Sequence, residues 1–207
     1  MTANVRGAAL MMASMTAFTV NDTFVKLLGQ DVPFFQFLFL RSVGAAALML
    51  LLARYLGAVR WPELARDRWL IAIRSLAEVA AAYLFLTALI HMPIANVTAI
   101  LQALPLTVAL GAALFLGEEV GWRRVAAIGS GMIGVYLIVR PGAEGFSVYS
   151  VYVLLAVVGV TIRDLAARRL SAEVTSLTVA LAGVFAILTF SAVGAVGTNW
   201  VQMTPIG

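Results

Sequence analysis

Seven apolar stretches of about 20 residues, separated by short polar breaks, are the feature that most restricts how this chain can fold. A helix needs about 20 apolar residues to cross a bilayer, because each residue rises about 1.5 Å and the hydrocarbon core is about 30 Å thick. The breaks contain Gly, Pro and charged residues, which end helices. We expect about seven membrane-spanning helices, over residues 5–28, 34–56, 69–90, 94–116, 122–139, 147–165 and 175–197.

The composition agrees with an all-α integral membrane protein surrounded by lipids. Of the 207 residues, 62% are hydrophobic and 12% are charged, whereas a soluble domain has about 45–50% and about 25%. The net charge of +4 comes from basic residues spread over short loops, which argues against a nucleic-acid partner. One histidine and no cysteine make a nitrogen or sulfur zinc site unexpected, and no cofactor or metal is expected.

The positions of Lys and Arg predict the orientation, because cytoplasmic loops are enriched in them. If alternate loops are assigned to one side, ten basic residues fall there and two fall on the other side, Lys26 and Arg140. The sequence therefore predicts a multi-pass protein of the cytoplasmic (inner) membrane with its amino terminus in the cytoplasm. The ten residues are Arg6, Arg54, Arg60, Arg66, Arg68, Arg123, Arg124, Arg163, Arg168 and Arg169.

Polar side chains inside the apolar stretches are the candidates for function, because a charge at the centre of a bilayer costs at least about 2.5–3.5 kcal/mol unless it is paired or hydrated. One group is expected in the outer third of the membrane and another in the inner third. Either group could line a cavity or gate, or could simply pin helices together as ion pairs. The outer group is Asn21, Asp22, Lys26 and Arg41, and the inner group is Arg74, Glu78 and Asp164.

Two further spans carry interrupted or small-residue patterns. In the fourth span, Asn96 and Gln102 are candidates for a cavity wall, and Pro105 is expected to bend the helix because proline removes a backbone hydrogen bond. In the fifth span, small residues recur every four positions, a spacing that lets another helix approach closely. We expect this face to pack against a helix, through Ala126, Ser130 and Gly134.

A shift of 142 residues reveals a possible internal repeat. The shift places Asp22 on Asp164 and Lys26 on Arg168. A repeat unit of five spans contains an odd number, so a second copy would enter the membrane from the opposite side, in agreement with the loop charges. The similarity is short, and apolar helices resemble one another by chance.

The segment HMPIANVTAILQALPLTVALGAALFLGEEVGWRRVAAIGSGMIGVYLIVRP, residues 91–141, resembles the end of a repeat of the EamA-type transporters in the drug/metabolite transporter superfamily. The LFLGE sequence at 114–118 is the part that looks most like the close of such a repeat. Asn21, Asp22, Lys26, Gly29 and Arg41 look similar to the opening of the branch that contains S-adenosylmethionine uptake carriers. The resemblance covers nearly the whole chain.

This resemblance implies ten helices in two inverted five-helix repeats around a central cavity. Residues 5–142 would form the first repeat and residues 147–207 the first two helices of the second. About three further spans would be expected, so the chain is expected to be a fragment or to complete the cavity wall with another subunit, as in a homodimer.

The leading hypothesis is a secondary transporter of a small, amino-acid-like or S-adenosylmethionine-like metabolite that works by alternating access, and not an enzyme. No residue is assigned a catalytic role in this interpretation. One alternative is an intramembrane enzyme acting on a lipid-linked substrate, with Asp22, Glu78 or His91 as acid or base. Another is an inactive truncated product. Substrate, direction of transport and coupling ion are left open.

Overall fold

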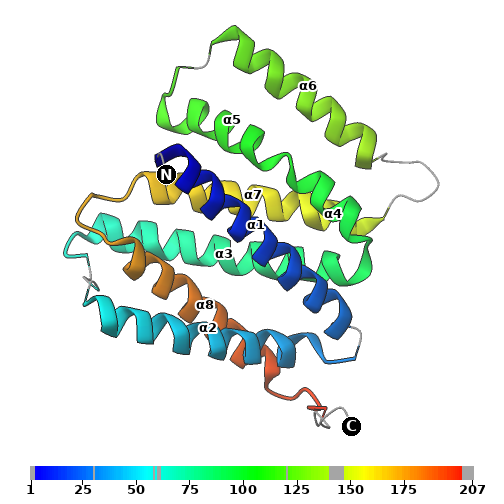
Figure 1. The fold of residues 1–207 in the computed structure, drawn as a ribbon, viewed down its shortest axis with the longest axis vertical. Coiled ribbons are helices and arrows are strands. Elements are labelled where there is room, and N and C mark those ends of the chain that lie inside the picture. Colours follow the sequence, from blue (N-terminus) through cyan, green and yellow to red (C-terminus); the bar gives the residue numbers. More distant parts are fainter. Residues whose placement is uncertain are drawn as a thin grey trace.

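The computed structural model describes residues 3–29, 31–57, 59, 62–119, 121–139 and 147–201, and every regular element in these ranges is a helix (Figure 1). All seven expected spans are helical, and the fourth is divided between two helices. The helices are α1 (Ala3–Leu28), α2 (Phe34–Leu56), α3 (Ala65–His91), α4 (Ile94–Leu101), α5 (Leu104–Leu116), α6 (Trp122–Val139), α7 (Val148–Arg168) and α8 (Ser176–Ala195).

Five segments of the described chain are long and apolar enough to cross a membrane, namely α2, α3, α4 together with α5, α7 and α8. α6 contributes a shorter apolar helix, Val125–Leu137. α1 is not among the five, and it carries the polar residues Asn21, Asp22 and Lys26 near its end. The expected all-α integral membrane architecture is confirmed.

The helix boundaries follow from a few residues with special backbone properties. Pro33 and Pro93 directly precede α2 and α4. The missing N–H group of proline breaks no hydrogen bond there, because the N–H groups at the start of a helix have no partner within the helix. Gly57 and Gly117 follow α2 and α5 with φ angles of 60° and 70°, the left-handed conformation that glycine adopts most easily. Ser147 caps α7 by accepting a hydrogen bond from the backbone of Tyr149.

The break between α4 and α5 lies at Gln102 and Ala103, which form a turn. Pro105 follows and has no N–H to donate to the carbonyl of Leu101, so the regular helical ladder cannot continue. The backbone tightens instead, with Ala103 N bonded to the carbonyl of Ile100 at 3.0 Å. The expected bend at Pro105 is therefore confirmed as a break.

The helix ends gather at two opposite ends of the molecule, as Figure 1 shows. The carboxyl ends of α5 and α7 meet the amino end of α3 at one of them, which we call the basic end because Arg66, Arg68, Arg168 and Arg169 lie there. Arg168 pairs with Glu118 at 3.0 Å. The carboxyl ends of α1 and α3 lie at the opposite end.

α3 lies at the centre of the described structure and packs most extensively against α7. The two helices approach closely at Gly159, where a side chain would lie 3.1 Å from the Cβ atom of Ala81. The apolar core sits toward the opposite end, where α3, α4 and α7 meet. Fully buried side chains there are Leu86, Leu89, Val97, Ile100, Val153 and Val157.

α1 is attached to this body mainly through its last turn. Val25 is 1% exposed and belongs to the apolar core, whereas every described side chain of α1 from Val5 to Val20 is exposed. In Figure 1 this helix crosses diagonally over α7 and α3. Most of α1 therefore lies on the surface of the described chain.

Candidate functional site

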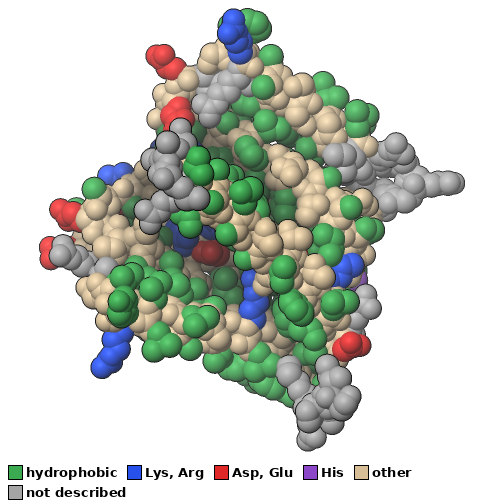
Figure 2. All heavy atoms as spheres, in the orientation of Figure 1, with side chains coloured by type: hydrophobic (Ala, Val, Ile, Leu, Met, Phe, Trp, Pro, Cys, Tyr) green, Lys and Arg blue, Asp and Glu red, His purple; other side chains and the backbone are tan. Residues whose placement is uncertain are grey.

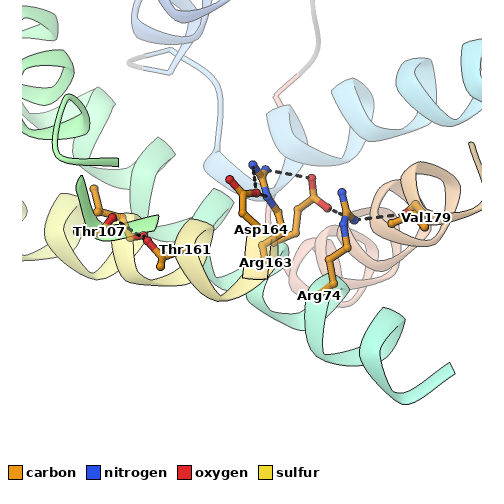
Figure 3. Close-up of polar contacts among 8 residues, drawn as sticks. Arg74, Thr107, Thr161, Arg163, Asp164 and Val179 are labelled. Atoms are coloured by element: carbon orange, nitrogen blue, oxygen red, sulfur yellow. Dashed lines mark hydrogen bonds and ion pairs between the residues drawn. The ribbon is translucent and has the colours of Figure 1, made fainter. Parts of the chain in front are cut away.

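Four charged side chains form a chain of ion pairs where α3, α7 and α8 meet, in the half of the molecule nearer the basic end (Figure 3). Arg74 Nη1 lies 2.8 Å from Glu78 Oε2, one helical turn away on α3. The other carboxylate oxygen of Glu78 lies 3.7 Å from Arg163 Nη1 on α7, and Arg163 lies 3.0 Å from Asp164 Oδ1. We call these residues, Arg74, Glu78, Arg163 and Asp164, the charge cluster.

α8 supplies both a hydrogen-bond acceptor and the space for this cluster. Arg74 Nη1 donates to the carbonyl oxygen of Val179 at 3.2 Å, which links α3 to α8 (Figure 3). One turn later, a Cβ atom at Gly183 would lie 2.4 Å from Glu78 Oε2 and 3.2 Å from Arg74 Nη1. The absence of a side chain at Gly183 therefore leaves room for the Arg74–Glu78 ion pair.

Solvent access increases along the charge cluster. The exposed fraction of the side chain rises from 15% for Arg74 and 24% for Glu78 to 30% for Arg163 and 39% for Asp164. Figure 2 shows basic and acidic side chains meeting in a hollow between α1 and α8. Two arginines and two carboxylates compensate one another's charge, which is the arrangement expected for ionisable groups at membrane depth. A solute entering the hollow would meet both signs of charge.

The expected inner group is thus assembled, with one addition. Arg74, Glu78 and Asp164 belong to one network, and Arg163 joins the two carboxylates. The sequence placed Arg163 only near a helix end, because its contact with Glu78 depends on the antiparallel register of α3 and α7. The signal that identifies it is its position next to Asp164.

The expected outer group is not brought into one network. Asn21 Nδ2 donates to Asp22 Oδ1 at 3.1 Å. Arg41 on α2 is close enough for its charge to attract that of Asp22, yet no ion pair joins these two within the described residues. Lys26 does not pair with Asp22 but binds backbone carbonyl groups of α3 and the residue after it. The role of Asp22 and Arg41 at a cavity or gate stays a prediction.

The polar residues of the broken fourth span point away from the described helices. The side chains of Asn96 and Gln102 are exposed, and the described structure records no hydrogen bond for either. Thr107 is different, since its hydroxyl lies 2.8 Å from that of Thr161 and joins α5 to α7 (Figure 3). A cavity wall formed by Asn96 and Gln102 stays a prediction.

The small-residue face of α6 is likewise not covered within the described chain. Ala126 and Ser130 are exposed, and a Cβ atom at Gly134 would meet nothing within 4 Å. α6 instead approaches α5 at Gly131, where a Cβ atom would collide with Leu106. Close packing through Ala126, Ser130 and Gly134 therefore stays a prediction for a partner outside these helices.

An apolar groove of about 660 Å³ lies between α2, α3 and α8. Its lining includes Leu50, Ile71, Leu181 and Phe185. Ser75 also lines the groove, and its buried hydroxyl has no hydrogen-bond partner in the described structure. The groove lies next to the charge cluster along α3 but contains none of its four residues.

Two of the three residues named as acid or base in the enzyme interpretation, Glu78 and His91, lie far apart. Glu78 and His91 are 13 residues apart on α3, which corresponds to about 20 Å along the helix. His91 is exposed and stacks on Tyr149, with ring centroids 4.3 Å apart. Among the described residues there is no group of three His, Cys, Asp or Glu side chains able to hold a metal ion.

Comparison with known proteins assigns the chain to a family. Residues 5–140, more than half of the chain, match the EamA-like transporter family. The chain belongs to the EamA-like transporter family. This assignment confirms the resemblance identified from residues 91–141, and it makes the chain part of a multi-pass membrane protein.

Relatives of this EamA-like chain carry transporter names. It is 28% identical over 192 residues to the pseudopaline exporter CntI of Pseudomonas aeruginosa strain UCBPP-PA14, an alignment covering 87% of this chain and 65% of the exporter. It is 34% identical over 84 residues to a riboflavin transporter of Brucella anthropi, covering 41% of this chain and 30% of that protein. An S-adenosylmethionine uptake transporter of Rickettsia bellii is 25% identical over 160 residues, covering 77% of this chain and 54% of the transporter.

The EamA-like chain spans less than two thirds of the length of these relatives. No solved structure matches it.

Proposed function

We propose that this chain is the substrate-binding part of a secondary transporter for a small metabolite that carries both a cationic and an anionic group. The charge cluster is the observation that carries the proposal. Its two arginines and two carboxylates are partly exposed in a hollow and could exchange their mutual ion pairs for ion pairs with a solute. The exporter and uptake names of the relatives support transport as the activity.

The distribution of polar and apolar contacts supports a conformation that is open toward the basic end. The charge cluster is accessible from that half, whereas the half toward the opposite end is filled by the apolar core around Leu89, Ile100 and Val153. A carrier exposes its site to one side at a time. If the basic end faces the cytoplasm, as loop charge favours, this conformation faces inward.

The helix boundaries support the inverted repeat on which alternating access would depend. Under the shift of 142 residues, the first residue of α2, Phe34, falls on Ser176, the first residue of α8. The last residue of α1, Leu28, falls two residues beyond the end of α7 at Arg168. The repeat boundaries 5–142 and 147–207, and assembly as a homodimer, remain parts of the proposal.

The decisive test compares variants of two carboxylates for binding and uptake of a probe in proteoliposomes. The probe is S-adenosylmethionine, because one relative is named for its uptake. We expect Glu78→Gln to lower binding and uptake of the probe by about tenfold or more, because Arg74 and Arg163 would lose their shared partner. Glu119→Gln is the matched control, since Glu119 is exposed in a loop. The assignment for this solute would be refuted if both variants took up the probe equally well. It would also be refuted if the unmodified chain and both variants failed to take up the probe.

An enzyme would be distinguished in the same preparation. A carrier moves the probe unchanged across the membrane, so the probe recovered from the vesicle lumen should have its original mass. Conversion of the probe by detergent-solubilised protein, where no two compartments exist, would favour the intramembrane enzyme instead.

A further inference from the structure

The attachment of α1 to the rest of the described chain is concentrated at the opposite end. Val25 is buried at 1% exposure, the lowest among the described side chains of α1. Gly29, directly after the helix, lies so close to α3 that a Cβ atom would be 2.7 Å from Ile90 Cγ1. The preceding residues of α1 expose large apolar side chains, among them Met11 and Met12 at 64% and 67%. Within the described residues, α1 is therefore held at one end, and most of its length is exposed.

Lys26 makes the polar part of this attachment. Its Nζ atom donates to the backbone carbonyl oxygens of Leu89 at 3.0 Å, Ile90 at 3.3 Å and Met92 at 2.6 Å. A lysine ammonium group has three N–H donors and no acceptor, so these contacts use its full capacity. The positive charge also lies at the carboxyl end of α3, where the helix dipole is negative.

The sequence explains why these carbonyl groups need a donor from outside α3. In a continuing helix, the carbonyl of Leu89 would accept a hydrogen bond from the residue four positions later, which is Pro93. Proline has no N–H group, and α3 ends at His91, so this carbonyl has no backbone donor. At membrane depth an unsatisfied carbonyl is costly, and Lys26 from a different helix removes that cost.

We propose that Lys26 is a positioning residue that fastens the carboxyl end of α1 to α3 and serves as the pivot about which the rest of α1 moves. Movement about this point would change how far α1 covers the hollow that holds the charge cluster. The pivot is at the end where the apolar core is packed, so α1 can swing without disturbing α3 and α7. Only the consequence for transport rests on the proposed function, because the attachment itself involves no substrate.

The chain offers a direct chemical test, because Lys26 is its single lysine. An amine-reactive acetylating reagent applied to the 207-residue protein in nanodiscs should modify Lys26 slowly, since all three of its donors are engaged. The reference is a lysine in the exposed loop after α1, Asp31→Lys combined with Lys26→Arg. We expect acetylation of Lys26 to be at least about tenfold slower than at the reference position, as measured on the separated peptides by mass spectrometry.

A second variant examines the attachment without altering the lysine. Gly29→Val would place side-chain atoms against Ile90 and should push the end of α1 away, so that acetylation of Lys26 approaches the reference rate. Gly7→Val is its control, since a Cβ atom there meets nothing within 4 Å. The proposal would be overturned if Lys26 in the unmodified protein reacted as fast as the reference lysine in its double variant, or if Gly29→Val left the rate at Lys26 unchanged.

The pivot itself is tested by a distance measurement, which is simple because the chain has no cysteine. Spin labels at Met11→Cys on α1 and Leu76→Cys on α3, both at exposed positions, report the separation of the two helices. We expect Lys26→Met to broaden the distance distribution and Lys26→Arg, which keeps donors for the carbonyl groups, to restore it. An unchanged distribution in a folded Lys26→Met variant would show that Lys26 does not position α1. Failure to transport any solute would leave these two measurements unaffected.

Discussion

Gly183 lies where even a methyl group would collide with the charge cluster. A Cβ atom there would be 2.4 Å from Glu78 Oε2, so alanine would force the carboxylate away from Arg74. We expect Gly183→Ala to lower probe binding by about tenfold without lowering the thermal unfolding midpoint, because alanine favours a helix by about 0.5–1 kcal/mol over glycine. Gly44→Ala on α2 is the control, since nothing lies within 4 Å of its Cβ position. Equal binding by the two variants would contradict this role of Gly183.

At the residue scale, the sequence predicts contacts within one helix better than contacts between helices. Arg74 and Glu78 are four residues apart, so helical periodicity alone predicts their pairing. Asp22 and Lys26 have the same spacing, but Lys26 instead binds backbone carbonyl groups 63 to 66 residues away in the chain, among them that of Leu89, which Pro93 leaves without a donor. Arg163 was missed for a similar reason, because its contact with Glu78 arises only from the pairing of α3 with α7.

At the element scale, hydropathy predicts where helices lie but not how they pack. The bounds of α2 and α6 coincide with the apolar stretches, and the break before Pro105 follows from proline chemistry. The packing face of α6 could not be obtained in this way, because several of its faces are rich in small residues. A glycine identifies the packing face of α6 only when the neighbouring residue is known, as for Gly131, which lies against Leu106.

The α3–α7 contact gives a prediction at this scale. A side chain at Gly159 would lie 3.1 Å from Ala81 Cβ and 3.3 Å from the carbonyl of Ala77, so Gly159→Leu should force the two helices apart. We expect a loss of about 1–3 kcal/mol or more in the free energy of unfolding, as for other overpacked cores. Gly129→Leu on α6, where the Cβ position is open, should cost far less. Reversible unfolding in mixed detergent micelles measures both, and equal losses would exclude close α3–α7 packing.

At the scale of the whole molecule, the two ends differ in charge and in packing. The described arginines Arg66, Arg168 and Arg169 lie at the basic end, and the charge cluster lies in the half nearer to it. The opposite end holds the apolar core and the Lys26 attachment. Loop charge therefore predicts that the basic end, and with it the amino terminus, faces the cytoplasm. Under the proposed function, this predicted orientation would let a solute reach the charge cluster from inside the cell.

This orientation can be measured on intact cells because the chain lacks cysteine. A single cysteine at Asp31→Cys, in the loop between α1 and α2, should react with a membrane-impermeant maleimide added outside. A cysteine at Glu119→Cys, in the exposed loop between α5 and α6, should react only after the cells are permeabilised. The reverse pattern would place the amino terminus outside, and the hollow would then open outward. In that case a solute would reach the same charge cluster from outside the cell. The inward-facing part of the proposal would then be wrong, but the assignment of the charge cluster as the binding site would be unaffected.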